Sequence, residues 1–216
     1  EHGDEALNER YGHVRGSLDT LHEIYRLLLK RRKRRGAIDF DSDEVKFVFD
    51  ADGRVQGLHR RSRHDAHRLI EECMIAANVQ AAKSARDAGL PTLFRVHEPP
   101  PPDKLAELET FLSAHGLKVT WKEEPEPADL ERIQRKARGT PIEPLVDAVL
   151  LRSLALAVYQ PENRGHFGLA LDAYAHFTSP IRRYPDLLLH RALKHRLQQR
   201  RKGDYPYSAG RMTELG

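Results

Sequence analysis

The chain has 216 residues, of which 39% are hydrophobic and 31% charged, and its net charge of +4 is too small to identify a partner by itself. This composition suits a soluble globular protein with a modest core. The single cysteine, Cys73, excludes a disulfide framework and favours a reducing cytosol. No apolar run approaches membrane-spanning length, and no signal peptide is visible. Because the chain starts at Glu1 and stops at Gly216 in mid-pattern, we expect a piece of a longer polypeptide.

The first half of the chain predicts two helices and a hairpin. Residues 1–16 are polar and without a period, and a helix should run from near Ser17 to its C-cap at Gly36. Alternating residues then predict strands over 45–49 and 55–59, joined by a turn. The next helix spans 62–88, and its apolar spacing predicts a buried side made of Leu69, Ile70, Met74, Ala77 and Ala81.

The second half begins with a short strand over 93–97 and four consecutive prolines, 99–102. The prolines form a stiff connector, but the segments on either side are too small to fold alone, so we do not expect a domain boundary there. A short strand is expected around Trp121, between a helix over 103–115 and one over 127–138. The remaining predicted elements are helices over 103–115, 127–138 and 143–158, a strand over 165–178, and a helix opening near Ser179.

Two polar clusters have simple structural explanations. Between Arg26 and Arg35, seven of ten residues are Lys or Arg. Cations are favourable at a helix C-terminus, so a solvated helix end explains them, and contact with a phosphate backbone is the functional alternative. His64 and Asp65 form an adjacent pair of the kind found in metal sites, but no further ligands stand out. We expect Asp65 to cap or charge the start of its helix.

Two neighbouring glutamates lie on the helix over 62–88. Because residues on a helix are about 100° apart, only one of Glu71 and Glu72 can face a cleft. Glu71 shares a face with His67 and Asn78. This polar line is either a solvated stripe or the lining of an RNA channel that bonds ribose hydroxyls. For Glu72 we favour the solvated interpretation.

The aromatic strand over 165–178 offers further candidates. Core packing is the better interpretation for Phe167, and Gly165 and Gly168 indicate close approach of the backbone to another strand or a ligand. Tyr174 and His176 share one face of the strand. Either side chain could meet a base or a phosphate, or be buried and hydrogen-bonded.

Two arginines, Arg182 and Arg183, are predicted in the first turn of the last helix. A helix dipole favours acids at that end, so the pair is best compensated by an anion such as phosphate. Pro180 fits the first helical position, with Ser179 or Thr178 as the cap. Asp186 follows the arginines by four and three residues and can brace either guanidinium. The alternative is a surface ion-pair cluster.

These segments resemble the RNB catalytic domain of the ribonuclease II/ribonuclease R exoribonucleases, and most closely its ribonuclease R branch. The resemblance runs from the first helix through GAIDFDSDEVKFVFD, HRLIEECMIAAN, NRGHFGLAL and TSPIRRYPDLLLHRALK. It implies an α+β fold with a mixed or antiparallel sheet flanked by helices. It also implies that residues 1–216 are a partial RNB domain, without its upstream aspartate cluster and its distal end.

The resemblance implies a processive exoribonuclease that hydrolyses RNA from the 3′ end to nucleoside 5′-monophosphates. Magnesium would be held by aspartates upstream of this chain, and the alternating Asp39, Asp41 and Asp43 should not be taken as that site. The expected partners are single-stranded RNA and the rest of the same polypeptide, including cold-shock-type and other RNA-binding barrels. No membrane is expected, and the expected location is cytoplasmic.

The resemblance also assigns roles to individual residues. Arg182 matches the catalytic arginine, braced by Asp186, and Glu71 matches a glutamate that contacts RNA. We assign further RNA contacts to Ser179, Arg183, Tyr174 and His176. Two alternatives remain: a non-catalytic RNA-binding module on the same scaffold, and a helical interaction protein, which leaves the arginine pair unexplained. The upstream aspartate cluster would separate the enzyme from the non-catalytic module.

Overall fold

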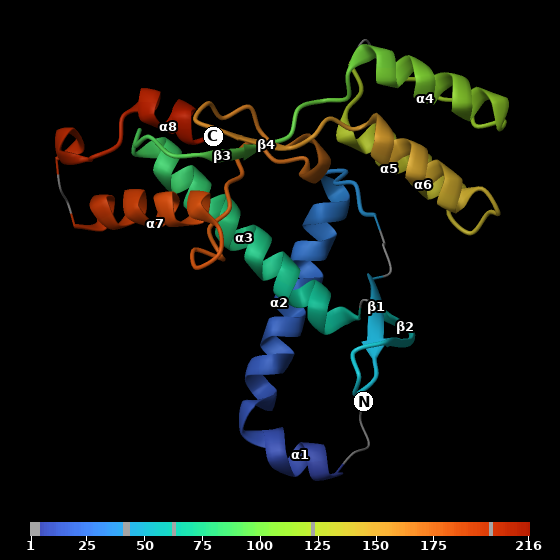
Figure 1. The fold of residues 1–216 in the computed structure, drawn as a ribbon, viewed down its shortest axis with the longest axis horizontal. Helices are drawn as coiled ribbons and strands as arrows, with labels where there is room; N and C mark the ends of the chain where they lie inside the picture. Colours follow the sequence, from blue (N-terminus) through green and yellow to red (C-terminus); the bar gives the residue numbers. More distant parts are fainter. Residues whose placement is uncertain (1–4, 41–43, 62–63, 122–123, 199–200) are drawn as a thin grey trace. The chain divides into compact units, whose positions relative to one another are not determined.

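The computed structural model describes residues 5–40, 44–61, 64–121, 124–198 and 201–216 (Figure 1). The chain divides into two compact units, Glu1–Arg31 with Asp41–Cys73, and Arg32–Phe40 with Met74–Gly216. The four prolines lie inside the second unit, which confirms that they do not divide domains. Helices and strands are both present, so the α+β prediction is confirmed. The single sheet expected between helices is instead two separate two-stranded antiparallel sheets.

The first unit contains a hairpin and parts of two long helices. Its elements are α1 (Glu5–Tyr11), a 3-10 turn (Gly12–Val14), most of α2 (Arg15–Arg34), β1 (Glu44–Phe49), β2 (Val55–Arg61) and the start of α3 (Asp65–Asp87). The expectation of an irregular segment before Ser17 is wrong, because α1 and the start of α2 occupy it. The hairpin is confirmed, and Phe47 lies opposite Leu58 across it.

The buried side of α3 differs from the predicted one. Ile70 and Met74 are exposed, whereas Glu72 is only 4% exposed and shares a helix face with the buried Ile75 and Val79. The solvated interpretation of Glu72 is therefore wrong. The predicted stripe counted only apolar residues, and the observed buried face also includes polar ones.

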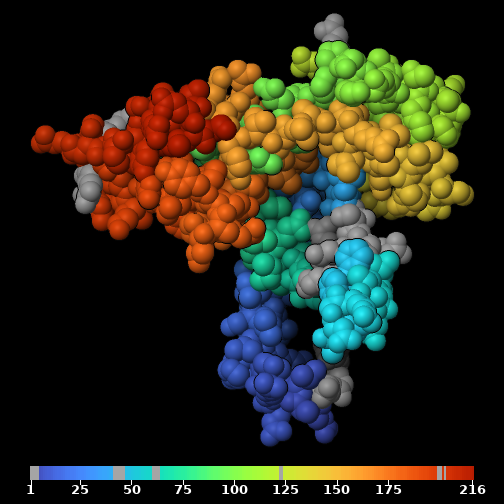
Figure 2. All heavy atoms as spheres, in the orientation of Figure 1, coloured from blue at the N-terminus to red at the C-terminus, as the bar shows by residue number. Residues whose placement is uncertain are grey.

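The second unit holds the largest core. Its elements are β3 (Phe94–Val96), α4 (Pro102–Ala114), α5 (Pro127–Ala137), α6 (Glu143–Ser153), β4 (Val158–Gln160), a 3-10 turn (Phe167–Leu169), α7 (Tyr184–Leu197), a second turn (Lys202–Asp204) and α8 (Ala209–Leu215). Leu108, Leu130 and Val146, from α4, α5 and α6, are completely buried together. Figure 2 shows α4 in green against the yellow α6. Trp121 packs on this cluster and is not in a strand.

The end of α2 is built into this second unit. Gly36 has φ +75°, and the N–H groups of Gly36 and Ala37 donate to the carbonyls of Lys33 and Arg32, which forms a Schellman C-cap. A Cβ on Gly36 would lie 2.5 Å from Cβ of Ala128, so only glycine fits. Two cations of the basic run are structural: Arg32 pairs with Asp39 at 3.3 Å, and Arg35 donates to the carbonyl of Leu169 at 2.8 Å. The other Lys and Arg side chains of the run are exposed.

Two further predicted elements in this unit are wrong. The helix expected to reach residue 158 ends at Ser153, and Tyr159 then pairs with Arg95 of β3. The expected strand over 165–178 is an irregular segment with a 3-10 turn. Its glycines do mark close approaches: a Cβ on Gly168 would lie 2.9 Å from Nδ1 of His97. Across the described part of the chain, no helix has the length and hydropathy needed to cross a bilayer.

Candidate functional site

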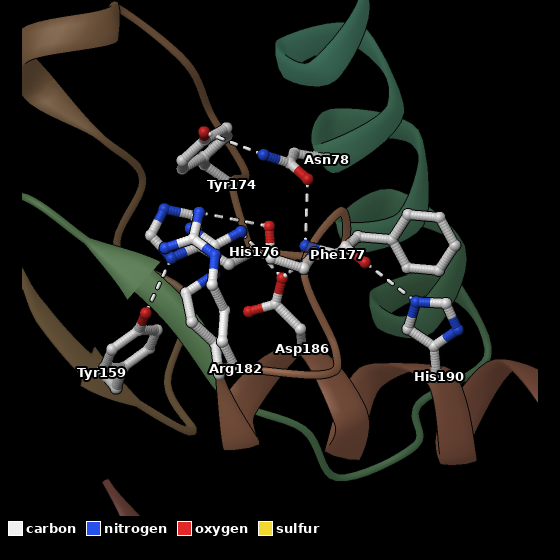
Figure 3. Close-up of polar contacts among 10 residues, drawn as sticks. Asn78, Tyr159, Tyr174, His176, Phe177, Arg182, Asp186 and His190 are labelled. Atoms are coloured by element: carbon white, nitrogen blue, oxygen red, sulfur yellow. Dashed lines mark hydrogen bonds and ion pairs between the residues drawn. The ribbon is translucent and has the colours of Figure 1, made fainter.

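The segment that leads to the two arginines is fixed to α3 by Asn78 (Figure 3). Asn78 is 3% exposed, donates to Oη of Tyr174 at 3.0 Å, and accepts from the N–H of Phe177 at 2.9 Å. The Phe177 ring stacks on His190 of α7, and Nε2 of His190 lies 2.8 Å from the Phe177 carbonyl. The backbone just before the arginines is therefore held from two helices.

The arginines lie on a separate turn ahead of α7. The carbonyl of Ser179 accepts from the N–H groups of Arg182 and Arg183 at 3.2 and 3.1 Å. Arg183 then becomes extended and serves as the N-cap residue, and Pro185 occupies the first helical turn. The predictions that Pro180 opens the helix and that Ser179 or Thr178 caps it are wrong, because the extended backbone at Arg183 separates the turn from the helix.

Asp186 closes this turn from the first turn of α7. Its side chain is completely buried, and its Oδ1 atom accepts from the N–H of Ser179 at 2.8 Å. The same oxygen accepts from Nη2 of Arg183 at 2.8 Å. The prediction that Asp186 braces Arg182 is therefore wrong. It neutralises Arg183, the other arginine of the pair.

Arg182 is left facing solvent. Its guanidinium donates to Oγ of Ser179 at 3.4 Å, and within the described residues it pairs with no carboxylate. The neighbouring Ile181 is fully exposed at the tip of the turn. A guanidinium held in this way can grip two oxygens of a phosphate in one plane. The turn thus brings together Ser179, Arg182 and Arg183, and their contact with RNA stays a prediction.

His176 and Tyr174 lie beside this turn. The hydroxyl of Tyr159 is 2.7 Å from Nδ1 of His176, and the rings of Tyr174 and His176 contact edge to face. Burial, together with the positive charge of Arg183, lowers the pKa of His176 to about 4, so the imidazole is neutral near pH 7. Tyr174 is only 7% exposed. Its ring serves the packing of this unit, and its contact with RNA stays a prediction.

Sequence reasoning missed two further histidines: the ring of His166 contacts Tyr174, and the ring of His97 contacts His166. His97 accepts from the N–H of Gly168 at Nδ1 and donates from Nε2 to the carbonyl of Ala155. His166 accepts from the N–H of Leu169 and caps the 3-10 turn. Burial lowers the pKa of both and brings that of His166 to about 3. Both act as neutral structural groups. No motif in the neighbouring sequence indicated that these two histidines would be buried and hydrogen-bonded to the backbone.

Glu71 and the metal question involve other parts of the chain. Glu71 is a half-buried residue of the first unit, whereas the arginine turn belongs to the second. The contact of Glu71 with RNA stays a prediction.

Among the described residues, no group of three His, Cys, Asp or Glu side chains could hold a metal ion. Asp39 is paired with Arg32, and Asp41 and Asp43 lie outside the described residues. Asp39 is thus engaged in an ion pair, and the expectation that these aspartates are not the magnesium site stays a prediction.

An exposed arginine on a braced turn has the chemistry needed to bind a phosphate group. The comparison with family models is more specific. The model described as the RNB domain matches residues 2–199, and the chain belongs to this family.

Individual relatives agree with this assignment. Ribonuclease R of Escherichia coli (strain K12) is 44% identical over 99% of this chain and 27% of its own length. Ribonuclease R of Aquifex aeolicus is 42% identical over 99% of this chain and 30% of its own length. Mycoplasma genitalium RNase R, solved in complex with ribose methylated single-stranded RNA, superposes with a TM-score of 0.86 at 25% identity, covering 93% of this chain and 32% of that one. The chain thus spans about a third or less of each of these relatives.

Proposed function

We propose that residues 1–216 form part of the RNB catalytic domain of a processive 3′-to-5′ exoribonuclease, which hydrolyses RNA to nucleoside 5′-monophosphates in the cytoplasm. The observation that carries this proposal is Arg182. Arg182 is exposed and has no carboxylate partner among the described residues, and Asp186 braces the turn that carries it. The chain that presents this arginine belongs to the RNB family. The names of the two ribonuclease R relatives described above support the same activity.

Arg182 would act on the scissile phosphate. Negative charge grows on the phosphate oxygens when water attacks, so a cation already in place stabilises the transition state more than the bound substrate. The hydroxyl of Ser179 lies beside the guanidinium and offers a further donor. Arg183, already paired with Asp186, would contribute to the potential that attracts RNA.

Magnesium is proposed to be held by aspartates upstream of residue 1, as the resemblance to the RNB domain implies. The described residues include no group of ligands for it. The proposed partner is single-stranded RNA, which the Mycoplasma genitalium relative binds in its solved complex. Cold-shock-type and other RNA-binding barrels are proposed to lie elsewhere in the same polypeptide.

The test compares the full-length polypeptide with residues 1–216 alone. A single-stranded RNA labelled at its 5′ end is incubated with each in the presence of magnesium. The full-length polypeptide should shorten the RNA from its 3′ end and release mononucleotides, and residues 1–216 alone should not. RNA binding without any release would establish the non-catalytic module instead. Release by residues 1–216 alone would show that the carboxylates needed for hydrolysis are not upstream.

A further inference from the structure

The hydrogen bond between Tyr159 and His176 joins β4 to the segment that carries the arginine turn. Oη of Tyr159 lies 2.7 Å from Nδ1 of His176, which precedes Ser179 by three residues. Figure 3 draws His176 and Arg182 in the same cluster of polar contacts. A tyrosine on the short strand β4 is thus hydrogen-bonded to the segment that carries the proposed phosphate site.

Tyr159 is itself held firmly. The guanidinium of Arg95, its partner across the β3–β4 pair, lies 4.7 Å from the centre of the Tyr159 ring. Tyr159 also packs on a buried cluster formed by Leu93, Leu188 and Met212. A cation over the ring face and apolar contacts beside it leave the hydroxyl little freedom to turn away from His176.

The bond determines which nitrogen of His176 carries the hydrogen. Among the described residues, the Tyr159 hydroxyl has no other hydrogen-bond partner, and a phenol O–H that donates to Nδ1 makes that nitrogen the acceptor. A neutral imidazole has one N–H, which must then lie on Nε2. The charged groups that act on this ring are Arg183, Asp186, Arg95 and Arg182, and three of these four are cations. Positive surroundings disfavour a second proton, so the ring stays a neutral donor.

We propose that Tyr159 is a positioning residue, which holds His176 with its hydrogen on Nε2 so that this N–H donates to a non-bridging oxygen of the phosphate gripped by Arg182. The proposal rests on the proposed exoribonuclease function and adds a second, uncharged donor to the site. A donor aimed at an oxygen on which charge develops contributes most in the transition state. An imidazole with the opposite tautomer would present a lone pair to the phosphate and repel it.

Substitutions that mimic one ring nitrogen at a time test the proposal in the full-length polypeptide. The amide nitrogen of glutamine can take the place of Nε2, and the amide group of asparagine that of Nδ1. In single-turnover cleavage of a single-stranded RNA, His176→Gln should lose about threefold in rate, and His176→Asn about 10- to 100-fold. Tyr159→Phe should lose about three- to tenfold, because both tautomers become accessible. RNA affinity should change less than about threefold in each variant.

The opposite order of the two histidine variants, or equal rates in both, would overturn the proposal, since Nε2 would then do nothing for the reaction. A second readout does not depend on activity. Histidine-selective ¹⁵N NMR of the wild type should show hydrogen on Nε2 of His176, with a mixture of tautomers in Tyr159→Phe, and a hydrogen on Nδ1 in the wild type would refute the assignment. If the wild type releases no nucleotide, the proposed function fails, whereas the NMR result still decides the tautomer.

Discussion

The buried carboxylate of Asp186 accepts a hydrogen bond from the guanidinium of Arg183 at 2.8 Å, and this contact separates the roles of two adjacent arginines. Arg183 precedes α7 as its N-cap residue. Asp186 lies in the first helical turn, where the helix dipole stabilises a negative charge. Arg182 stands one residue further out, is exposed, and pairs with no carboxylate among the described residues. The arrangement neutralises the cation nearest the helix and leaves the exposed one uncompensated.

Breaking this contact should destabilise the second unit. Asp186→Asn retains an acceptor for the N–H of Ser179 but removes the charge that balances the half-buried Arg183. We expect a loss of about 3 kcal/mol in the free energy of unfolding, because one partner of a buried ion pair is left alone. Urea unfolding followed through Trp121, the one tryptophan, measures it. The matched control is Glu214→Gln, which breaks an exposed pair of the same spacing with Arg211 and should cost less than about 1 kcal/mol. Equal losses in both variants would contradict the prediction.

Arg182→Lys should slow RNA cleavage by the full-length polypeptide by about two to four orders of magnitude. Lysine keeps the charge but cannot grip two phosphate oxygens in one plane, and losses of comparable electrostatic groups have this size. RNA affinity should fall far less, because many other contacts share it. Single-turnover cleavage with a separate binding measurement resolves the two effects.

The matched control for Arg182 is its neighbour. Arg183→Lys keeps a cation beside Asp186 and should lower the rate by less than about tenfold. A near-normal rate for Arg182→Lys, or a defect confined to binding, would reduce Arg182 to one more phosphate contact.

Glu71→Ala should weaken binding of RNA more than binding of DNA of the same sequence. A carboxylate that accepts from a ribose 2′-hydroxyl is specific to RNA, and loss of such a charge-assisted bond costs about 1.5–3 kcal/mol. Binding of both oligonucleotides to the full-length polypeptide, wild type and variant, gives the comparison. Should the two substrates weaken equally, or neither change, Glu71 has no part in recognising ribose.

Acid should destabilise the second unit through its neutral histidines. Burial lowers the pKa of His166 to about 3 and that of His176 to about 4, and lowers that of His97 from the usual 6.5. Below pH 6.5 the unfolded chain therefore binds protons that the folded chain excludes. The free energy of unfolding should fall as the pH drops from about 6.5 towards 4, by up to about 1.4 kcal/mol per pH unit for each histidine.

Urea unfolding of residues 1–216 between pH 7 and 5, followed through Trp121, tests this dependence. His166→Asn keeps an acceptor for the N–H of Leu169 but cannot titrate. The free energy of unfolding of this variant should therefore depend less steeply on pH, by the contribution of one histidine. The control His13→Asn, at an exposed residue of the first unit, should leave the slope as it is. A slope unaffected by His166→Asn would show that His166 accepts a proton in the folded chain.

Local patterns along the chain predicted most of the regular structure. The turn between β1 and β2 is closed by Asp50, whose carboxylate accepts from the N–H groups of Asp52 and Arg54, and such a turn is readable from neighbouring residues alone. The end of α2 at Gly36 is equally local, since a Schellman cap needs a residue with positive φ. β4 was missed because its three residues gain their strand conformation from pairing with β3, far away in the sequence.

The sequence by itself determined that Ser179, Arg182, Arg183 and Asp186 belong to one short segment, which lies within the residues that the family model matches. It could not decide which arginine Asp186 would bind, because spacings of three and four residues both join neighbours on a helix. In the tertiary structure Asp186 binds Arg183. The extended backbone at Arg183 places Arg182 outside the helix, so a spacing of four residues no longer brings Arg182 next to Asp186. Burial was likewise a tertiary outcome. Asn78 and Glu72 became interior residues because of the segments packed against α3, which no pattern within that helix records.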